Sequence, residues 1–192
     1  MATRNVAIPT LALLASLSSG FSSSVMAGGP NYNFIEARYL LDAELENVDG
    51  DGLRFDGSYR FTRQVFGFAE FDSVDLDNYD ADLDVLKLGA GYIHPINASM
   101  DFNLSLAYVD AEVDARGANY DDSGFEISGG IRTMIQPNIE LRANANYIDI
   151  EDDDTYFTLG GDYFFMSNFS AGLEIDLGAD YETLSIGARY SF

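Results

Sequence analysis

Apolar and polar residues alternate along most of the chain from Ile35 onward. The clearest case is residues 53–61, where the odd positions are apolar or glycine and the even positions are polar or charged. A β-strand separates two such sets onto opposite faces because successive side chains point to opposite sides of the backbone, whereas a helix would mix them. This pattern therefore predicts β-structure.

Ten segments show this period of two, with turn residues between them. They are residues 31–42, 53–61, 64–73, 84–93, 102–109, 125–132, 140–147, 157–165, 170–177 and 184–192. In residues 64–73, placing Glu70 and Asp72 on the polar face also puts Phe66 and Phe68 there, which a bulge or a thick aromatic belt could reconcile. No segment has a helical period, so we predict an all-β fold with ten antiparallel strands joined in sequence order; eight strands is the alternative if a weaker segment pairs differently.

Connection lengths and charge favour a transmembrane barrel over a soluble β-sandwich. The odd connections (43–51, 73–83, 110–123, 149–155 and 178–182) are generally longer than the even ones, as expected for outer loops and periplasmic turns. They also hold 20 of the 32 acidic residues and a single basic residue, Arg116. A sandwich has no reason to sort charge between its two ends in this way, so we predict an up-and-down barrel with acidic extracellular loops.

Charged residues of both signs occupy the polar faces of the predicted strands. In a membrane barrel these faces line the lumen, where opposite charges can pair. The predicted lumen network consists of the basic residues Arg38, Arg54, Arg60, Lys87, Arg132, Arg142 and Arg189 and the acidic residues Glu36, Asp56, Glu70, Asp72, Glu126, Glu140, Asp162, Glu174 and Asp176. Tyrosines at the strand ends suit the aromatic girdles of such barrels; they are Tyr39, Tyr59, Tyr92, Tyr108, Tyr147, Tyr163 and Tyr190.

The last segment, Leu184-Ser-Ile-Gly-Ala-Arg-Tyr-Ser-Phe192, alternates in the same way and ends in phenylalanine. With the glycine- and tyrosine-rich strands, it resembles the C-terminal strand of small OmpA/OmpX-type outer-membrane β-barrels of Gram-negative bacteria. That resemblance implies an outer-membrane location and recognition of Tyr190 and Phe192 by the barrel-assembly machinery. The group usually has eight strands, and the ten predicted here depart from it.

The N-terminus has the layout of an export signal. Arg4 precedes the largely apolar run Val6–Leu17, and Val25-Met26-Ala27 ends in the small residue that signal peptidase requires. The run is too short for a transmembrane helix, which needs about 20 apolar residues. We therefore expect cleavage after Ala27, leaving residues 28–192 as one domain. That domain contains no cysteine, so hydrogen bonding and burial must hold it together without disulfides.

Composition excludes several functions. With 32 acidic against 10 basic residues, the chain has no basic patch for nucleic acid. Catalysis is not expected, because there is no cysteine and the one histidine, His94, is followed by Pro95 in a predicted periplasmic turn. Families of outer-membrane barrel enzymes rely instead on a histidine near the outer leaflet.

The acidic runs 151–154 and 75–77 do not have the spacing of a calcium loop, so we expect no specific metal site and no cofactor. An acidic rim could still share the divalent cations that bridge lipopolysaccharide phosphates. The leading hypothesis is a monomeric structural barrel with a narrow, charge-filled lumen. The alternatives are a narrow porin-like channel, and adhesion or partner binding through the 110–123 connection with Arg116 and Tyr120.

Overall fold

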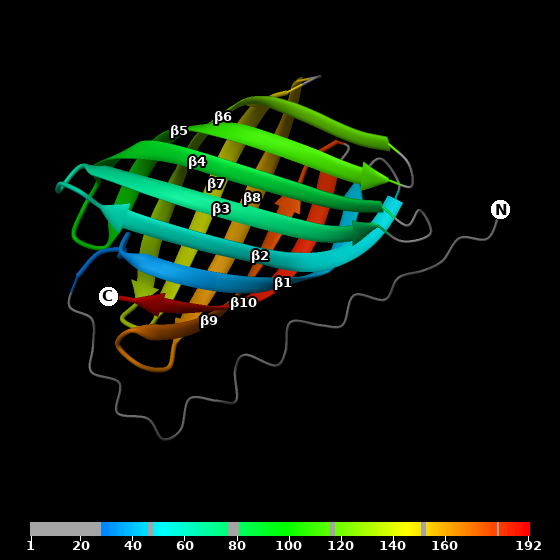
Figure 1. Cartoon of the computed structure of the whole chain (residues 1–192). Helices are drawn as coiled ribbons and strands as arrows, with labels where there is room; N and C mark the ends of the chain where they lie inside the picture. The colour runs from blue at the N-terminus through cyan, green and yellow to red at the C-terminus, as the bar shows by residue number, and fades with distance from the viewer. Residues whose placement is uncertain (1–27, 46–47, 77–80, 116–117, 151–152, 180) are drawn as a thin grey trace.

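The computed structural model describes residues 28–45, 48–76, 81–115, 118–150, 153–179 and 181–192; the predicted signal peptide lies outside them. Ten antiparallel strands form a closed barrel in sequence order, with β1 paired to β10 (Figure 1). The strands are β1 Phe34–Leu45, β2 Val48–Arg60, β3 Val65–Leu76, β4 Ala81–Pro95, β5 Met100–Ala115, β6 Ala118–Gln136, β7 Ile139–Asp149, β8 Asp153–Phe164, β9 Phe169–Leu177 and β10 Tyr181–Ser191. The predicted ten-stranded, all-β barrel is therefore confirmed.

Closure leaves no free strand edge, so backbone hydrogen bonds run around the whole sheet. At the closing seam, Phe34 lies opposite Ser191 and Ile35 opposite Tyr190. The register of β1 shifts after Leu40 against both of its neighbours. Such a bulge adds local twist and bends the strand, which helps to curve a small sheet.

The two ends of the barrel differ. One end, here called the turn end, holds the short connections 61–64, 96–99, 137–138 and 165–168 together with the start of β1 and the end of β10. Thr62 and Asn97 accept backbone N–H hydrogen bonds within two of these turns, as polar turn residues commonly do. The other end, here called the acidic end, holds the predicted odd connections.

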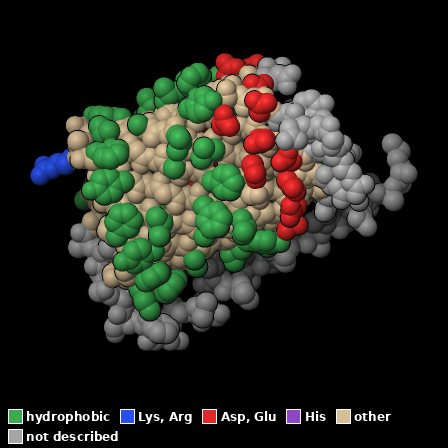
Figure 2. Space-filling view, in the orientation of Figure 1, with side chains coloured by type: hydrophobic (Ala, Val, Ile, Leu, Met, Phe, Trp, Pro, Cys, Tyr) green, Lys and Arg blue, Asp and Glu red, His purple; other side chains and the backbone are tan. Residues whose placement is uncertain are grey.

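The apolar face of each strand points outward. Large apolar side chains form a broad band on the face of the outer wall that Figure 2 shows. Around the barrel, outward-facing residues such as Ile35, Phe55, Leu104, Ile127 and Leu159 are each about half exposed. A water-soluble barrel would bury these side chains and expose its charges, and this protein does the reverse. No helix in the described ranges is long and apolar enough to cross a membrane.

The three connections predicted to be longest are mostly strand, which corrects that expectation. Ala43 pairs with Gly50, Leu76 with Ala81, and the β5–β6 ladder extends as far as Ala115 opposite Ala118. Aspartate has a low strand propensity, which is why these segments resembled loops. Yet small and apolar residues such as Ala111 and Val113 still alternate with the acids, and this alternation keeps the sheet going.

The acids of these extended strands form an outward-facing row just beyond the apolar band, here called the acidic belt (Figure 2). In the described part of the chain it comprises Asp51, Asp75, Asp82, Asp84, Asp110, Glu112, Asp114, Asp121, Asp149, Asp153 and Glu182. Tyrosines at the edge of the band contact it: the Tyr39 hydroxyl donates to Asp51 at 2.5 Å and the Tyr108 hydroxyl to Asp110 at 3.1 Å. Apolar, aromatic and acidic zones thus follow one another along the outer wall.

Candidate functional site

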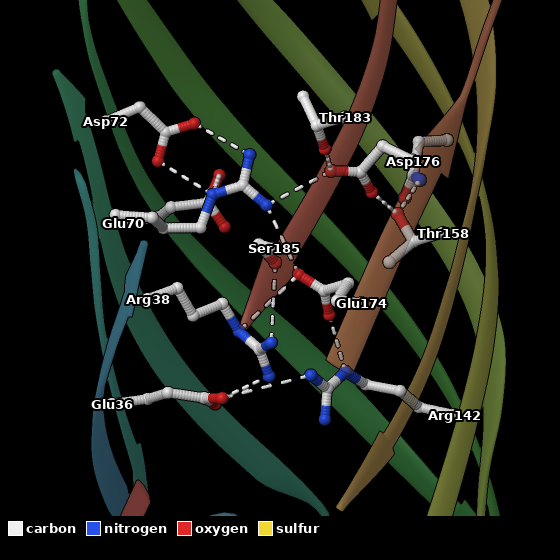
Figure 3. Close-up of polar contacts among 12 residues, drawn as sticks. Glu36, Arg38, Glu70, Asp72, Arg142, Thr158, Glu174, Asp176, Thr183 and Ser185 are labelled. Carbon is white, nitrogen blue, oxygen red and sulfur yellow. Dashed lines mark hydrogen bonds and ion pairs between the residues drawn. The ribbon is translucent and has the colours of Figure 1, made fainter. Parts of the chain in front are cut away.

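The polar face of every strand points into the lumen, and the charged side chains meet there (Figure 3). Alternation alone sets this inward direction. Arg38, Arg54, Glu140, Asp162, Asp176 and Arg189 are all nearly or fully buried. A buried charge is tolerated only when it is paired and hydrogen-bonded, so the pairing of each side chain matters.

Arg54 on β2 is the centre of the network. Its Nε and Nη2 donate to both carboxylate oxygens of Asp72 on β3, at 2.8 and 2.7 Å. Its Nη1 reaches β9 on another part of the wall, at 3.2 Å from Glu174 and 3.1 Å from Asp176. The bidentate pair fixes the guanidinium plane, and the other two contacts connect β2 with β9 through the lumen.

Two threonines hold Asp176 in place. Thr158 on β8 donates its hydroxyl to one carboxylate oxygen at 2.6 Å, and Thr183 on β10 donates to the other at 2.8 Å. Asp176 itself is 1% exposed. With Arg54 also bound, the carboxylate is fully coordinated by hydrogen-bond donors, as a buried charge requires.

A second arginine, Arg142 on β7, binds Glu174 and Asp162. Its Nε donates to Glu174 at 2.7 Å, and its Nη1 contacts Asp162. Arg38 on β1 also contacts Glu36 and lies 3.7 Å from Glu174. Glu174 therefore lies among three arginines, and its two oxygens join the upper and lower parts of the network (Figure 3).

The network continues toward the turn end through Arg189 and Arg132. Arg189 donates twice to Glu36, at 2.9 and 2.7 Å, and once to Glu140 at 3.2 Å. Arg132 donates to the same oxygen of Glu140 at 3.0 and 2.6 Å. These contacts tie β1, β6, β7 and β10 together within the lumen.

Lys87 on β4 forms a smaller cluster, which Glu70 joins to Arg54 at 4.0 Å. Its ammonium group lies 3.0 Å from Glu70 and 2.9 Å from Glu126, and it donates to the Tyr156 hydroxyl at 3.0 Å. Tyr156 in turn donates to Glu126 at 2.6 Å. All three donor directions of the ammonium group thus point to oxygens.

Aromatic and apolar side chains close the turn end of the lumen. Tyr32, just before β1, is 1% exposed and packs 5.0 Å from the ring of Phe66 and against Ile93. The guanidinium groups of Arg132 and Arg60 lie over its ring at 4.4 and 4.9 Å. Burial raises the pKa of the Tyr32 hydroxyl to about 12, although Arg132 acts in the opposite direction.

The segment carrying Tyr32 is bound to the barrel by its backbone. Arg132 donates to the Asn31 carbonyl at 3.0 Å and Arg60 to the Pro30 carbonyl at 3.3 Å. The side-chain oxygen of Asn33 accepts a hydrogen bond from the Arg60 backbone N–H at 2.7 Å. The backbone carbonyl of Asn33 accepts one from the Phe192 N–H at 3.0 Å. Residues 30–33 therefore connect the start of β1 and the C-terminal Phe192 with the turn end of the lumen.

Near the acidic end a second apolar cluster faces inward. Leu40, Ala43 and Val74 are buried there, with Leu76 and Leu83 packed against them. The charged network thus lies between two apolar clusters along the barrel axis.

Phe66 and Phe68 settle the ambiguity of β3. Both side chains face the lumen, and β3 pairs with β2 and β4 without a register shift, so neither the predicted bulge nor the thick outer belt occurs. Each phenylalanine lies opposite a lumen-facing glycine of β4, Gly91 and Gly89, which leave room for the rings. The charges of Glu70 and Asp72 therefore predicted the correct inward face of β3.

Most residues predicted for the lumen are brought together there, and two differ. Arg60 contacts the Pro30 carbonyl and the Tyr32 ring, away from the central network. Asp56 lines the lumen but has no ion-pair partner among the described residues. The network also has uncharged members. Thr158 and Ser185 lie on the predicted polar faces, but their contacts with the charged residues were not predicted. Tyr32, Tyr156 and Thr183 were missed, although Tyr156 and Thr183 continue the alternation of their strands and could have been found by it.

Other predicted residues lie outside the lumen. His94 is exposed near the end of β4 at the turn end, in the strand and not in the turn itself. Tyr190 and Phe192 face outward, and Tyr190 packs 4.8 Å from Phe169; their role in assembly stays a prediction. Arg116 is outside the described residues. Within the described ranges, no three acidic, histidine or cysteine side chains are placed to hold a metal ion.

Comparison with known proteins identifies the family. The outer membrane protein beta-barrel domain matches residues 6–192. The fold is similar to the NanC porin (TM-score 0.55, 9% identity, 82% of this chain and 100% of that one) and to the KdgM porin (TM-score 0.51, 14%, 83% and 99%). Neisserial surface protein A gives a TM-score of 0.44 at 17% identity, over 83% and 95% of the two chains. Comparison with curated proteins gives no match. The chain belongs to the outer membrane β-barrel family.

Proposed function

We propose that this protein is a structural component of the outer membrane whose barrel is closed to solutes. The turn end would face the periplasm and the acidic end the exterior. The observation that carries the proposal is the way Arg54 binds Asp72 on one side of the lumen and Glu174 and Asp176 on another. An ion passing through would have to displace these buried pairs, and leaving one charge of a buried pair without its partner costs about 3–5 kcal/mol.

The apolar clusters at both ends support the same conclusion. Tyr32, Phe66 and Ile93 pack together at the turn end, and Leu40 and Val74 pack near the acidic end. Apolar constrictions oppose the passage of water and ions even where the backbone leaves space. We also infer that the protein is not an enzyme: His94, the only histidine in the chain, is exposed at the turn end, away from the outer leaflet.

Single-channel recording tests the closed barrel. Reconstituted in planar bilayers, the wild-type protein should show no steady conductance. Arg54→Ala removes the link between β2 and β9, and we expect either intermittent conductance or a lower unfolding temperature. Arg63→Ala, at an exposed turn position, is the matched control and should stay silent and stable. Steady wild-type conductance would contradict the proposal.

A narrow porin-like channel is the second candidate. A cavity of about 170 Å³ lies in the central lumen, and two similar folds belong to porins. Those likenesses concern the fold, at 14% identity or less, and the conductance measurement separates the two functions. Adhesion through the β5–β6 hairpin is a third candidate function; β6, with 19 residues, is the longest strand in the described part of the chain.

The acidic belt supports a lipopolysaccharide-facing role for the same barrel. Its carboxylates project sideways from the wall, beside the tyrosine edge of the apolar band, and not only upward from loops. We therefore propose contact with the phosphate-bearing zone of the outer leaflet through shared divalent cations. Because the described residues include no three-carboxylate metal site, these cations would be held diffusely along the belt.

A further inference from the structure

Charges in the lumen do not balance. The central network contains nine carboxylates and six cations, so negative charge exceeds positive by three. The carboxylates are Glu36, Asp56, Glu70, Asp72, Glu126, Glu140, Asp162, Glu174 and Asp176; the cations are Arg38, Arg54, Lys87, Arg132, Arg142 and Arg189. Asp101 and Arg60 at the turn end add one charge of each sign. Excess charge in a low-dielectric interior is costly unless something neutralises it.

The excess is concentrated at Asp56. Its cross-strand neighbours on the two sides are Glu36 on β1 and Glu70 on β3, so three carboxylates lie in a row across the wall. Glu36 is bound by Arg38 and Arg189, and Glu70 by Lys87. Asp56 makes no ion pair in the described structure, and its Oδ2 is buried without a hydrogen-bond donor.

The cavity beside Asp56 is lined by further oxygens that lack partners. Ser58, the next inward residue on β2, is 8% exposed, and its hydroxyl has no hydrogen bond among the described residues. The Tyr32 hydroxyl and the Asn144 amide oxygen line the same cavity and likewise have no hydrogen-bond partner among the described residues. A cavity of about 170 Å³ far exceeds the space for one water, about 10–15 Å³ by the same measure. It can therefore hold a hydrated ion.

We propose that the lumen binds a monovalent cation, Na⁺ or K⁺, at Asp56, with Ser58 as a second oxygen ligand and water completing the shell. Hard oxygen ligands suit such ions, and one unpaired carboxylate matches a single positive charge. A divalent site is disfavoured because the described side chains include no group of three carboxylates arranged to hold a metal. The ion neutralises part of the excess and fills a position that no arginine or lysine of the network occupies.

The test measures unfolding of the full-length folded protein in neutral detergent. Midpoints of the heat-modifiable gel shift are compared in NaCl, KCl and choline chloride at equal ionic strength and pH 7.5. Bound Na⁺ or K⁺ should raise the midpoint over choline, by about 3 °C or more for each tenfold rise in cation concentration above its dissociation constant. Asp56→Asn should abolish this difference, and in choline it should unfold at a higher temperature than the wild type because the row of like charges is broken.

Two further variants complete the design. Ser58→Ala removes only the second ligand and should weaken the cation dependence several-fold. This variant still tests the site if Asp56→Asn does not fold. Asp110→Asn, on the exposed outer wall, should keep the full dependence. Equal midpoints in choline and in the alkali chlorides, or an unchanged dependence in Asp56→Asn, would overturn the proposal. If the wild-type protein is insensitive to Na⁺ and K⁺ but is stabilised at acidic pH, and Asp56→Asn removes that stabilisation, Asp56 holds a proton in place of the cation. This result would also overturn the proposal.

Discussion

Large inward side chains of this barrel repeatedly lie opposite a glycine on the neighbouring strand. Phe66 and Phe68 lie over Gly91 and Gly89, and Arg142 lies over Gly160. A ten-stranded lumen is too narrow for bulky residues on every strand, so each one needs an empty position beside it. Glycine here supplies space, and this explains why so many glycines occur inside predicted strands.

Substitution at Gly89 tests this explanation. A Cβ there would lie 2.5 Å from the Phe68 ring and 2.7 Å from the Leu106 carbonyl oxygen, and the backbone atom cannot move aside cheaply. Gly89→Ala should lower the free energy of unfolding by about 1–3 kcal/mol, as overpacking usually does. Urea unfolding in detergent micelles measures it. Gly57→Ala, whose Cβ would meet nothing within 4 Å, should stay close to the wild type, and an equal loss in both variants would refute the role of space.

At the scale of elements, residues 30–33 act as part of the barrel although they belong to no strand. Their carbonyls accept hydrogen bonds from Arg60 and Arg132, and Tyr32 fills the turn end of the lumen. The Tyr32 hydroxyl is buried in the folded state and exposed to water in the unfolded state. The folded barrel therefore favours the protonated phenol.

Alkaline unfolding should report this burial. The pKa of Tyr32 is about 12 in the folded protein against 10.0 for an unperturbed tyrosine, so the unfolded chain loses the proton first. Its stabilising contribution is complete below pH 10 and is lost as the pH rises toward 12, in total about 2–3 kcal/mol. Tyr32→Phe should flatten the decline in unfolding free energy between pH 10 and 12. Tyr59→Phe, on the exposed wall, should keep the wild-type profile; identical profiles for all three proteins would contradict the prediction.

The strands and their inward faces could be predicted from the sequence because alternation is a local property. Residues 53–61 show it without exception, and the charge of Glu70 and Asp72 fixed the direction of β3 even against Phe66 and Phe68. Partners across the lumen could not be predicted, since the contact of Arg54 with Asp176 joins residues 122 positions apart. The isolation of Asp56 likewise depends on which cations its neighbours have already taken. The predicted strands are shorter than the observed ones where aspartates alternate with alanine and valine, because aspartate has a low strand propensity and is typical of loops.

On the scale of the whole molecule, charge is sorted along the barrel axis and across its wall. In the central lumen network every carboxylate except Asp56 lies within ion-pair distance of a cation, whereas the acidic belt sets like charges directly opposite one another. Asp75 lies between Asp51 and Asp82, and Asp82 also lies opposite Asp114. Cross-strand pairs of like charge destabilise a sheet. A belt of this kind is stable only where counterions collect, and the lipopolysaccharide leaflet concentrates divalent cations between its phosphates.

If the acidic belt shares the divalent cations of lipopolysaccharide, as proposed, chelation should destabilise the barrel in a lipopolysaccharide leaflet and not in a phospholipid one. In lipopolysaccharide bilayers with Mg²⁺, we expect EDTA to lower the unfolding temperature by a few degrees, because the repulsion between Asp51, Asp75, Asp82 and Asp114 is then uncompensated. In a zwitterionic phospholipid bilayer, where bridging phosphates are scarce, EDTA should have little effect. The triple variant Asp75→Asn, Asp82→Asn, Asp114→Asn removes the repulsion and should be insensitive to EDTA in both bilayers. An unchanged unfolding temperature of the wild type in chelated lipopolysaccharide would eliminate the cation-bridged contact while leaving the closed barrel, whose ion pairs lie inside the lumen, unaffected.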